Sequence, residues 1–393
     1  MKFLIINTDY PVFLQWLYAQ YPGLEHQAYE KQMRLRNESL FGVADFYSNN
    51  LRKLGHEAWD IHVNNEFMQR AWAQGHSTRV GGPVITDRLL RVIFDVGRRI
   101  AIKAPARYLK PIFRLVAGSL YNLQSWFYDT MIAQVEHYKP DVLLNLNIGS
   151  ISSRFLKELK PYVRLLVGQI ASPLPDSKYF RGYDLIISSL PNFVEHFRRL
   201  GIPSELHKLA FESSVVSKLE TPDKKIPVSF VGSLSLHHET RIQLLEHLCS
   251  RLDIRVWGQG IEDLPKDSLV RRHYVGQAWG TEMYQILGSS KITVNHHINI
   301  SGSYANNMRL FEATGVGAML VTDWKKNLHE IFEPGKEVLA YRTPEECSEM
   351  IEYYLEHNDE RETVAHAGQV RTLREHTYYQ RMQELVEIIR KYL

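Results

Sequence analysis

Residues 303–323 constrain the fold of this chain of 393 residues more than any other segment. They combine a polar loop, a helical stretch with one acid at Glu312, a break at Gly315 and Gly317, and then a short apolar run. Glycine commonly ends a helix, and an uninterrupted apolar run suits a strand that is buried on both faces of a parallel sheet. A helix leading into such a strand is typical of a nucleotide-binding half-domain, so the segment predicts an α/β fold.

The start of this helical stretch suits an anionic ligand. Loop 299–302 can place free backbone N–H groups at the first helical turn, where the helix dipole favours a phosphate. Glu312 can accept hydrogen bonds from two ribose hydroxyls. Arg309 can bind a phosphate through two N–H groups, or form a surface salt bridge. Asn306 and Asn307 can cap the helix, contact the phosphate, or do both.

The order of residues in this region resembles the donor-binding half of GT-B glycosyltransferases. The matching pattern is Asn306-x-x-Arg309-x-x-Glu312-Ala-x-x-x-Gly317, then Asp323, then Glu330-Ile-Phe-x-Pro-Gly335-Lys-Glu337. The chain is similar to the spore-maturation CgeB-like group and, more remotely, to the large retaining family 4. The resemblance covers roughly residues 228–380; for residues 1–225 only the general layout is similar.

The family 4 donor motif has two Glu residues with seven residues between them. The resemblance matches the second, which binds the nucleotide ribose, to Glu312. The first, which contacts the transferred sugar, falls at Tyr304, so the chain departs from the pattern there and the sugar and the stereochemical outcome stay open. Ser303 and Tyr304 are still expected among the donor contacts. The resemblance implies a nucleotide diphosphate sugar donor and a retaining outcome. For the nucleotide itself, UDP is our first expectation and GDP the second.

Length and composition favour two soluble domains. A chain of 393 residues is too long for one ordinary core, and 44% hydrophobic with 23% charged residues is the composition of a globular protein. A net charge of +3 gives no support for a nucleic-acid partner. Cys249 and Cys347 provide neither a disulfide framework nor a metal quartet. No apolar run is long enough to span a membrane, so we expect a cytoplasmic protein.

Short apolar runs separated by helical stretches predict a parallel, doubly wound sheet in each half. We expect a first domain over 1–218, a second, donor-binding domain over 228–376, and a linker between them. Residues 377–393 are expected to form a helix that crosses back to the first domain. The expected strands lie at 2–7, 58–63, 141–146, 164–168, 184–188, 228–232, 254–257, 291–295 and 318–322, with helices over 38–54, 239–251 and 281–287.

Residues 64–135 are too long for one crossover helix and are interpreted as an insertion. Within it, segment 88–114 carries eight Lys or Arg residues against one acid, with apolar residues interleaved. Such a segment suits an anionic membrane surface or a phosphate-bearing acceptor, and an ordinary solvated helical face is the alternative. Peripheral contact with the inner face of the membrane is therefore one hypothesis.

Further donor-site candidates follow the expected strands of the second domain. Gly232 and Ser233 end the first of these strands, at the edge where α/β sheets bind ligands, and Arg241 on the next helix can reach a diphosphate. Gly258 and Gly276 lie in loops that frame the nucleotide base in GT-B enzymes, where their backbone groups can pair with a base edge.

Two acids are the candidates for the catalytic group on the acceptor side. Asp9 follows the first strand and Asp176 follows the fourth, and either can serve as a base or as a turn residue. No metal site is expected, because the chain has no Asp-x-Asp triplet and the adjacent His296 and His297 would point to opposite faces of a strand.

The sequence therefore predicts a metal-independent GT-B glycosyltransferase of the hexosyltransferase type, acting in glycan or cell-surface biosynthesis. Its acceptor hydroxyl would belong to a glycan, a lipid-linked molecule or a small molecule. Two alternatives remain: a nucleotide-sugar epimerase of the same fold, and a non-catalytic glycan or nucleotide binder. No cofactor besides the donor is expected.

Overall fold

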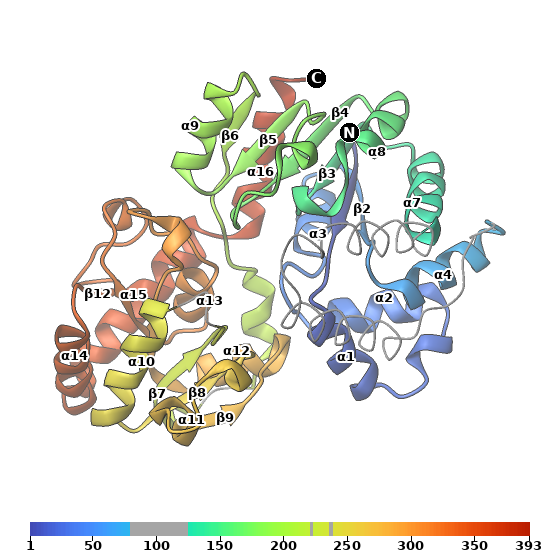
Figure 1. Ribbon diagram of the computed structural model, residues 1–393. Coiled ribbons are helices and arrows are strands. Elements are labelled where there is room, and N and C mark those ends of the chain that lie inside the picture. The colour runs from blue at the N-terminus through green and yellow to red at the C-terminus, as the bar shows by residue number, and fades with distance from the viewer. Residues whose placement is uncertain (79–124, 221–222, 236–238) are drawn as a thin grey trace, which may run out of the picture.

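The computed structural model describes residues 1–78, 125–220, 223–235 and 239–393. The basic segment 88–114 lies outside the described residues. Within them the chain forms two six-stranded sheets, each with helices on both faces, side by side in Figure 1. This is the expected α/β architecture of two Rossmann-like domains.

All strands of the first sheet are parallel, in the order β2-β1-β3-β4-β5-β6. The inner strands are mostly apolar and buried; Leu4 of β1, for example, is level with Trp59 of β2 and Leu143 of β3. The strands are β1 (Lys2–Asn7), β2 (Glu57–His62), β3 (Val142–Asn145), β4 (Leu165–Gln169), β5 (Leu185–Ser188) and β6 (Ser204–Leu206).

The helices of the first domain begin where local sequence favours a helix start. Proline stands at the first position of α1 and α9, and Asn65 and Ser152 accept backbone N–H groups as caps of α4 and α8. The helices are α1 (Pro11–Gln20), α2 (Tyr29–Glu38), α3 (Phe46–Lys53), α4 (Glu66–Gly75), α7 (Ser125–Tyr138), α8 (Ser153–Leu159) and α9 (Pro191–Arg199).

The second sheet repeats this plan with the order β12-β11-β10-β7-β8-β9. Helices α12 and α13 cover one face and α10 and α14 the other. The strands are β7 (Ile226–Val231), β8 (Ile254–Trp257), β9 (Tyr274–Gly276), β10 (Ser290–Asn295), β11 (Met319–Asp323) and β12 (Leu339–Tyr341). The helices are α10 (Glu239–Arg251), α11 (Leu269–His273), α12 (Gly280–Gly288), α13 (Arg309–Gly315), α14 (Pro344–Glu356) and α15 (Asn358–Glu375).

The last helix, α16 (Tyr378–Arg390), packs against α3 of the first domain and lies among its strands in Figure 1. It starts with a capping box between Thr377 and Gln380. Just before it, the chain pairs with the segment that leaves the first domain, through hydrogen bonds from Phe211 N to His376 O and from Tyr378 N to Phe211 O, each 2.9 Å. The two domains are thus joined by two adjacent chain crossings.

The helix expected over 38–54 is shorter than predicted, because α3 starts only at Phe46. Residues 39–45 form turns in which Leu40, Gly42 and Ala44 all have positive φ. Such a backbone cannot continue a right-handed helix.

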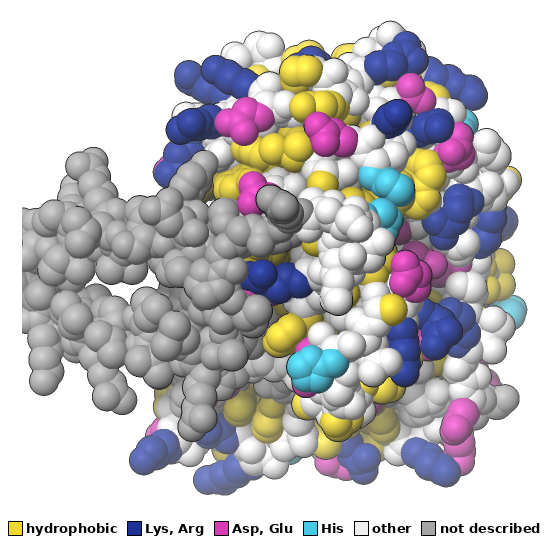
Figure 2. All heavy atoms as spheres, turned by 90° about the vertical axis from the view of Figure 1, so that its right-hand side faces the viewer, with side chains coloured by type: hydrophobic (Ala, Val, Ile, Leu, Met, Phe, Trp, Pro, Cys, Tyr) yellow, Lys and Arg dark blue, Asp and Glu magenta, His cyan; other side chains and the backbone are white. Residues whose placement is uncertain are grey.

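Three strands, β6, β9 and β12, were not predicted. Each has three residues and lies at the edge of its sheet. No helix of the described residues is long and apolar enough to cross a membrane. On the face shown in Figure 2, the described Lys and Arg side chains lie among Asp and Glu side chains and form no single basic patch.

Candidate functional site

The strand order of the second sheet places its topological switch point between β10 and β7, which run in parallel as neighbours. Open α/β sheets bind ligands in the crevice at the carboxyl ends of such strands. Gly232 and Ser233 follow β7, and His296 and His297 follow β10. The candidate donor site is built on these two strand ends.

Arg309 and Glu312 form a buried pair beside these strand ends. Arg309 Nη1 lies 2.8 Å from Glu312 Oε2, and Arg309 Nε donates to the carbonyl of Val231 at the end of β7. Burial raises the pKa of Glu312, although the charge of Arg309 opposes the rise. Among the described residues, the second carboxylate oxygen, Oε1, accepts only the hydroxyl of Tyr284, at 3.5 Å. One oxygen of Glu312 therefore keeps capacity to accept a ligand hydroxyl.

The loop before α13 is fixed by side-chain hydrogen bonds. Asn307 accepts the N–H of Leu310 at 3.3 Å and donates to Asn295 Oδ1 at 2.7 Å, so it caps the helix and ties it to β10. The carbonyl of Ser303 accepts the N–H of Lys326, whose ammonium lies 4.1 Å from the centre of the Tyr304 ring.

The neighbouring Asn306 is also buried. The structure thus ties Asn307 to the end of β10 and Arg309 to the end of β7. That residues 303–312 bind the donor stays a prediction.

Arg241 was expected to bind a diphosphate, but in the structure its guanidinium bonds backbone carbonyls. Its Nη1 donates to the carbonyl of Ser233 at 3.0 Å and its Nη2 to the carbonyl of His296 at 2.8 Å. It is buried, and its guanidinium lies over the ring of Phe230. Arg241 therefore ties the ends of β7 and β10 together and shapes the crevice, while two of its donor groups are already used.

Gly258 also departs from its expected role. Its N–H donates to Gly276 O and its carbonyl accepts the hydroxyl of Tyr274, each at 2.9 Å, so neither backbone group is free to pair with a base. A Cβ at Gly258 would lie 1.8 Å from the carbonyl oxygen of Gly232. The glycine is needed because the loops after β7 and β8 approach so closely.

A His–Asp–Lys cluster at the end of β11 was not predicted as part of the site. Asp323 accepts the backbone N–H of His297 at 2.9 Å and lies 2.6 Å from its Nδ1, and Lys325 approaches at 3.2 Å. Burial alone would raise the pKa of Asp323, but the hydrogen bond and charge of His297 outweigh it and lower this pKa. Two sequence features could have pointed to this cluster: Asp323 belongs to the pattern that resembles GT-B glycosyltransferases, and His296 and His297 stand side by side at the end of an expected strand.

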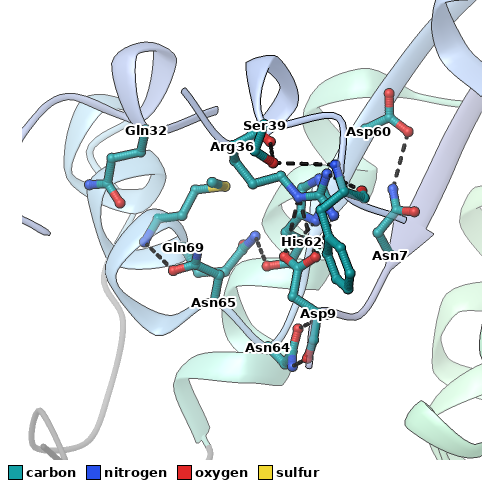
Figure 3. A network of polar contacts seen from close by, with 12 residues as sticks. Asn7, Asp9, Gln32, Arg36, Ser39, Asp60, His62, Asn64, Asn65 and Gln69 are labelled. Carbon is teal, nitrogen blue, oxygen red and sulfur yellow. Dashed lines mark hydrogen bonds and ion pairs between the residues drawn. The ribbon is translucent and has the colours of Figure 1, made fainter. Parts of the chain in front are cut away.

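Asp9 lies at the carboxyl end of β1 in the first domain, but it is fully buried (Figure 3). Arg36 Nε donates to its carboxylate at 3.2 Å, and His62 Nδ1 lies 2.9 Å away. Burial acts to raise the pKa of Asp9, but the charges of Arg36 and His62 lower it well below its usual range. A sealed, paired carboxylate of this kind is a poor base for an acceptor, so the geometry corrects the expected catalytic role to a structural one.

Asp176 differs from Asp9 in being exposed. It precedes the short helical turn Ser177–Tyr179 after β4, and Lys178 Nζ lies 3.4 Å from its carboxylate. Its role on the acceptor side stays a prediction. Asn147, which follows β3, was not predicted as a site residue. It is exposed and donates to Thr8 Oγ1 at 3.1 Å across the switch point of the first sheet, between β1 and β3.

Residues 241–387 match the family model described as glycosyl transferase-like. No curated protein matches the sequence. The chain has the GT-B fold.

Three solved structures share the fold over the full chain. HepE of Anabaena, in complex with UDP-glucose, has a TM-score of 0.57 at 13% identity, covering 100% of both chains. Sucrose-phosphate synthase of Thermosynechococcus elongatus has a TM-score of 0.58 at 11% identity, covering 100% of this chain and 98% of the other. A glycosyltransferase of Rickettsia africae has a TM-score of 0.54 at 10% identity, with the same coverage.

Proposed function

We propose that this protein is a glycosyltransferase that moves a sugar from a nucleotide diphosphate sugar to an acceptor hydroxyl, with UDP as the first expectation for the nucleotide. The observation that carries the proposal is the Arg309–Glu312 pair beside the crevice between β7 and β10. The UDP-glucose bound to the HepE structure, which shares the fold, supports the choice of UDP.

The residues of the crevice suit each part of such a donor. Glu312 would accept a ribose hydroxyl through Oε1, while Arg309 stays close enough to share its charge with the diphosphate. The departing diphosphate gains most from positive groups that are already in position when the bond breaks. Arg309 is held in this way, because Val231 O and Glu312 fix two of its nitrogens.

The proposal includes a metal-independent and retaining reaction in glycan or cell-surface biosynthesis. Cationic side chains and helix N–H groups would take the part that a metal ion plays in enzymes with an Asp-x-Asp triplet. The acceptor would bind at the first domain's strand ends, where Asp176 and Asn147 are exposed.

A donor screen tests the function. The protein is incubated with UDP- and GDP-sugars, with and without a mixture of glycan and lipid-linked acceptors, and products are followed by mass spectrometry. Sugar transferred to an acceptor supports the proposal. An altered donor without acceptor indicates an epimerase, and nucleotide binding without turnover indicates a binding protein; either result contradicts the proposal.

A further inference from the structure

Trp279, from the loop before α12 of the second domain, is buried among aromatic side chains of the first domain. Its ring lies edge-on to Phe41 with the ring centres 5.0 Å apart, and the centre of Phe13 is 6.1 Å away. Phe13 and Phe41 stack on each other at 4.1 Å. All the other members of this apolar cluster come from residues 12–41, so Trp279 is an insertion from the second domain into the first.

The residues after Trp279 meet the first domain through backbone atoms. The N–H of Thr281 donates to the carbonyl of Ser39 at 2.8 Å, and the Thr281 hydroxyl reaches the same oxygen at 3.3 Å. Gly280 has a φ of 53°, and a Cβ on it would lie 1.8 Å from that oxygen. Since the first N–H groups of a helix lack partners within it, the first domain supplies an acceptor for the first turn of α12.

The receiving backbone of the first domain is strained. Leu40 has a φ of 59° and Ala44 a φ of 40°, in the left-handed region that residues other than glycine rarely adopt. Such conformations persist only where surrounding contacts hold them, and they gather at functional positions. The strain therefore indicates that this short segment is held in a defined shape to receive the second domain.

The buried charges around Asp9 hold that shape (Figure 3). Arg36 Nη1 donates to the carbonyl of Phe41 at 3.1 Å, and the hydroxyl of Ser39 donates to the carbonyl of Arg36 at 2.6 Å. The remaining guanidinium nitrogens bond Asp9, which also lies beside His62. An unpaired buried charge would be costly, so Asp9 fixes the direction of Arg36, and Arg36 fixes the receiving segment.

We propose that Trp279 is a positioning residue for nucleotide binding, and that Ser39, Leu40 and Phe41 form the seat that holds it, here called the Ser39 seat. This inference rests on the proposed function, because Gly276, three residues before Trp279, lies in one of the loops expected to frame the nucleotide base.

The base loop is tied to the seated residue. Trp279 Nε1 donates to Gln277 Oε1 at 3.2 Å, and Gly276 O accepts the N–H of Gly258 from the neighbouring loop. In this proposal the Ser39 seat, by holding Trp279, anchors the loop over 277–279 that follows β9. When the domains separate, the loop loses its anchor, and the apparent nucleotide affinity falls with the fraction of molecules that keep the binding shape.

Two variants and one matched control test the seat in the full-length protein. Gly280→Ala places a methyl group against Ser39 O, and Trp279→Leu keeps an apolar side chain but removes the ring. Gly201→Ala is the control, because Gly201 also has a positive φ, 74°, but nothing lies within 4 Å of a Cβ there. Hydrogen exchange of residues 274–281, the radius of gyration from X-ray scattering, and UDP affinity by calorimetry are compared, with thermal melts to confirm folding.

We expect faster exchange over 274–281 and a larger radius of gyration in Gly280→Ala and Trp279→Leu, with UDP affinity about tenfold weaker as the binding-competent fraction falls to about a tenth. Gly201→Ala should match the wild type in all three. Unchanged exchange in both variants would overturn the seat. Faster exchange with unchanged UDP affinity would overturn the positioning role of Trp279.

The proposed function can fail separately from the seat. If the wild-type protein binds neither UDP, GDP nor their sugars, the donor assignment is wrong. The exchange and scattering measurements need no ligand, so they still decide whether the Ser39 seat holds the base loop.

Discussion

The guanidinium of Arg309 lies 2.8 Å from the carboxylate of Glu312, one turn further along α13, and both side chains are largely buried. The pair links the end of β7 to the helix that resembles the family 4 donor motif. A buried ion pair is weak evidence for stability, because removing both charges costs little while removing one leaves the other unpaired. Its position at the switch point therefore favours a role in binding.

Glu312→Gln should weaken nucleotide binding by about 1.5 to 3 kcal/mol, the contribution of one hydrogen bond to a charged group. Glutamine keeps the shape of the side chain, so less of the loss arises from unfolding than with alanine, which would leave Arg309 buried beside a cavity. Calorimetry with UDP and GDP measures the change. Glu362→Gln is the control, because Glu362 is an exposed acid of the same domain. If Glu312→Gln binds UDP and GDP as tightly as the wild type, Glu312 is not part of the nucleotide site.

Turnover should persist after chelation. The chain has no Asp-x-Asp triplet, and the proposed site meets the diphosphate charge with Arg309 and backbone N–H groups. Activity is compared in EDTA and in EDTA saturated with calcium, which controls for effects of the chelator itself. Loss of turnover in free EDTA, restored by Mg²⁺ or Mn²⁺, would show that the reaction depends on a metal.

Leu385→Ala should lower the free energy of unfolding by about 2 to 5 kcal/mol, because it opens a cavity at a fully buried position. Leu385 belongs to the cluster that α16 shares with α3 and with both sheets, so the loss should affect the two domains together. Urea denaturation followed by circular dichroism measures it. Leu373→Ala, at a partly exposed position of α15, should change stability by less than about 0.5 kcal/mol; equal losses in both variants would contradict the account.

The strands of both sheets could be predicted from sequence because a strand buried on both faces is an uninterrupted apolar run. Residues 254–257 and 2–7 have the same bounds in the sequence and in the structure. The edge strands β6, β9 and β12 were missed because three residues carry too little pattern. Residues 39–45 were read as helix, but Leu40 and Ala44 have left-handed conformations. Arg36 holds this segment through the carbonyl of Phe41, a contact that the local sequence does not show.

In the candidate site, too, local sequence predicts some features, and contacts between distant residues decide the others. The position of Glu312 and Arg309 on one helix turn follows from their spacing, and so does their place after β10. The sequence could not predict which groups bond each other across the fold. Arg241 donates to backbone carbonyls, and Gly258 accepts the hydroxyl of Tyr274. Asp9 pairs with the guanidinium of Arg36 and the imidazole of His62. These partners lie far from their targets along the chain.

Acid should destabilise the junction between the domains through two buried histidines. Burial lowers the pKa of His207 and of His376 to about 4, and the charge of Arg381 adds to the effect. Arg381 Nη2 lies 2.9 Å from His376 Nδ1, and the carbonyl of Arg381 lies 3.2 Å from His207 Nε2. Both histidines stay neutral in the folded protein at pH values where the unfolded chain, with a pKa of about 6.5, binds protons.

The unfolded state therefore gains protons between about pH 6.5 and pH 4, and the free energy of unfolding should fall as the pH drops through this window, by at most about 3 kcal/mol for each histidine. Asp60 acts in the opposite sense, because burial raises its pKa to about 7 and the folded state binds the extra proton as pH falls. To separate the effect of His376 from that of Asp60, the free energy of unfolding is measured by urea denaturation for the wild type and His376→Gln at pH 7 and pH 5. The variant should lose less stability between these two pH values, and an equal loss in both proteins would show that His376 does not contribute.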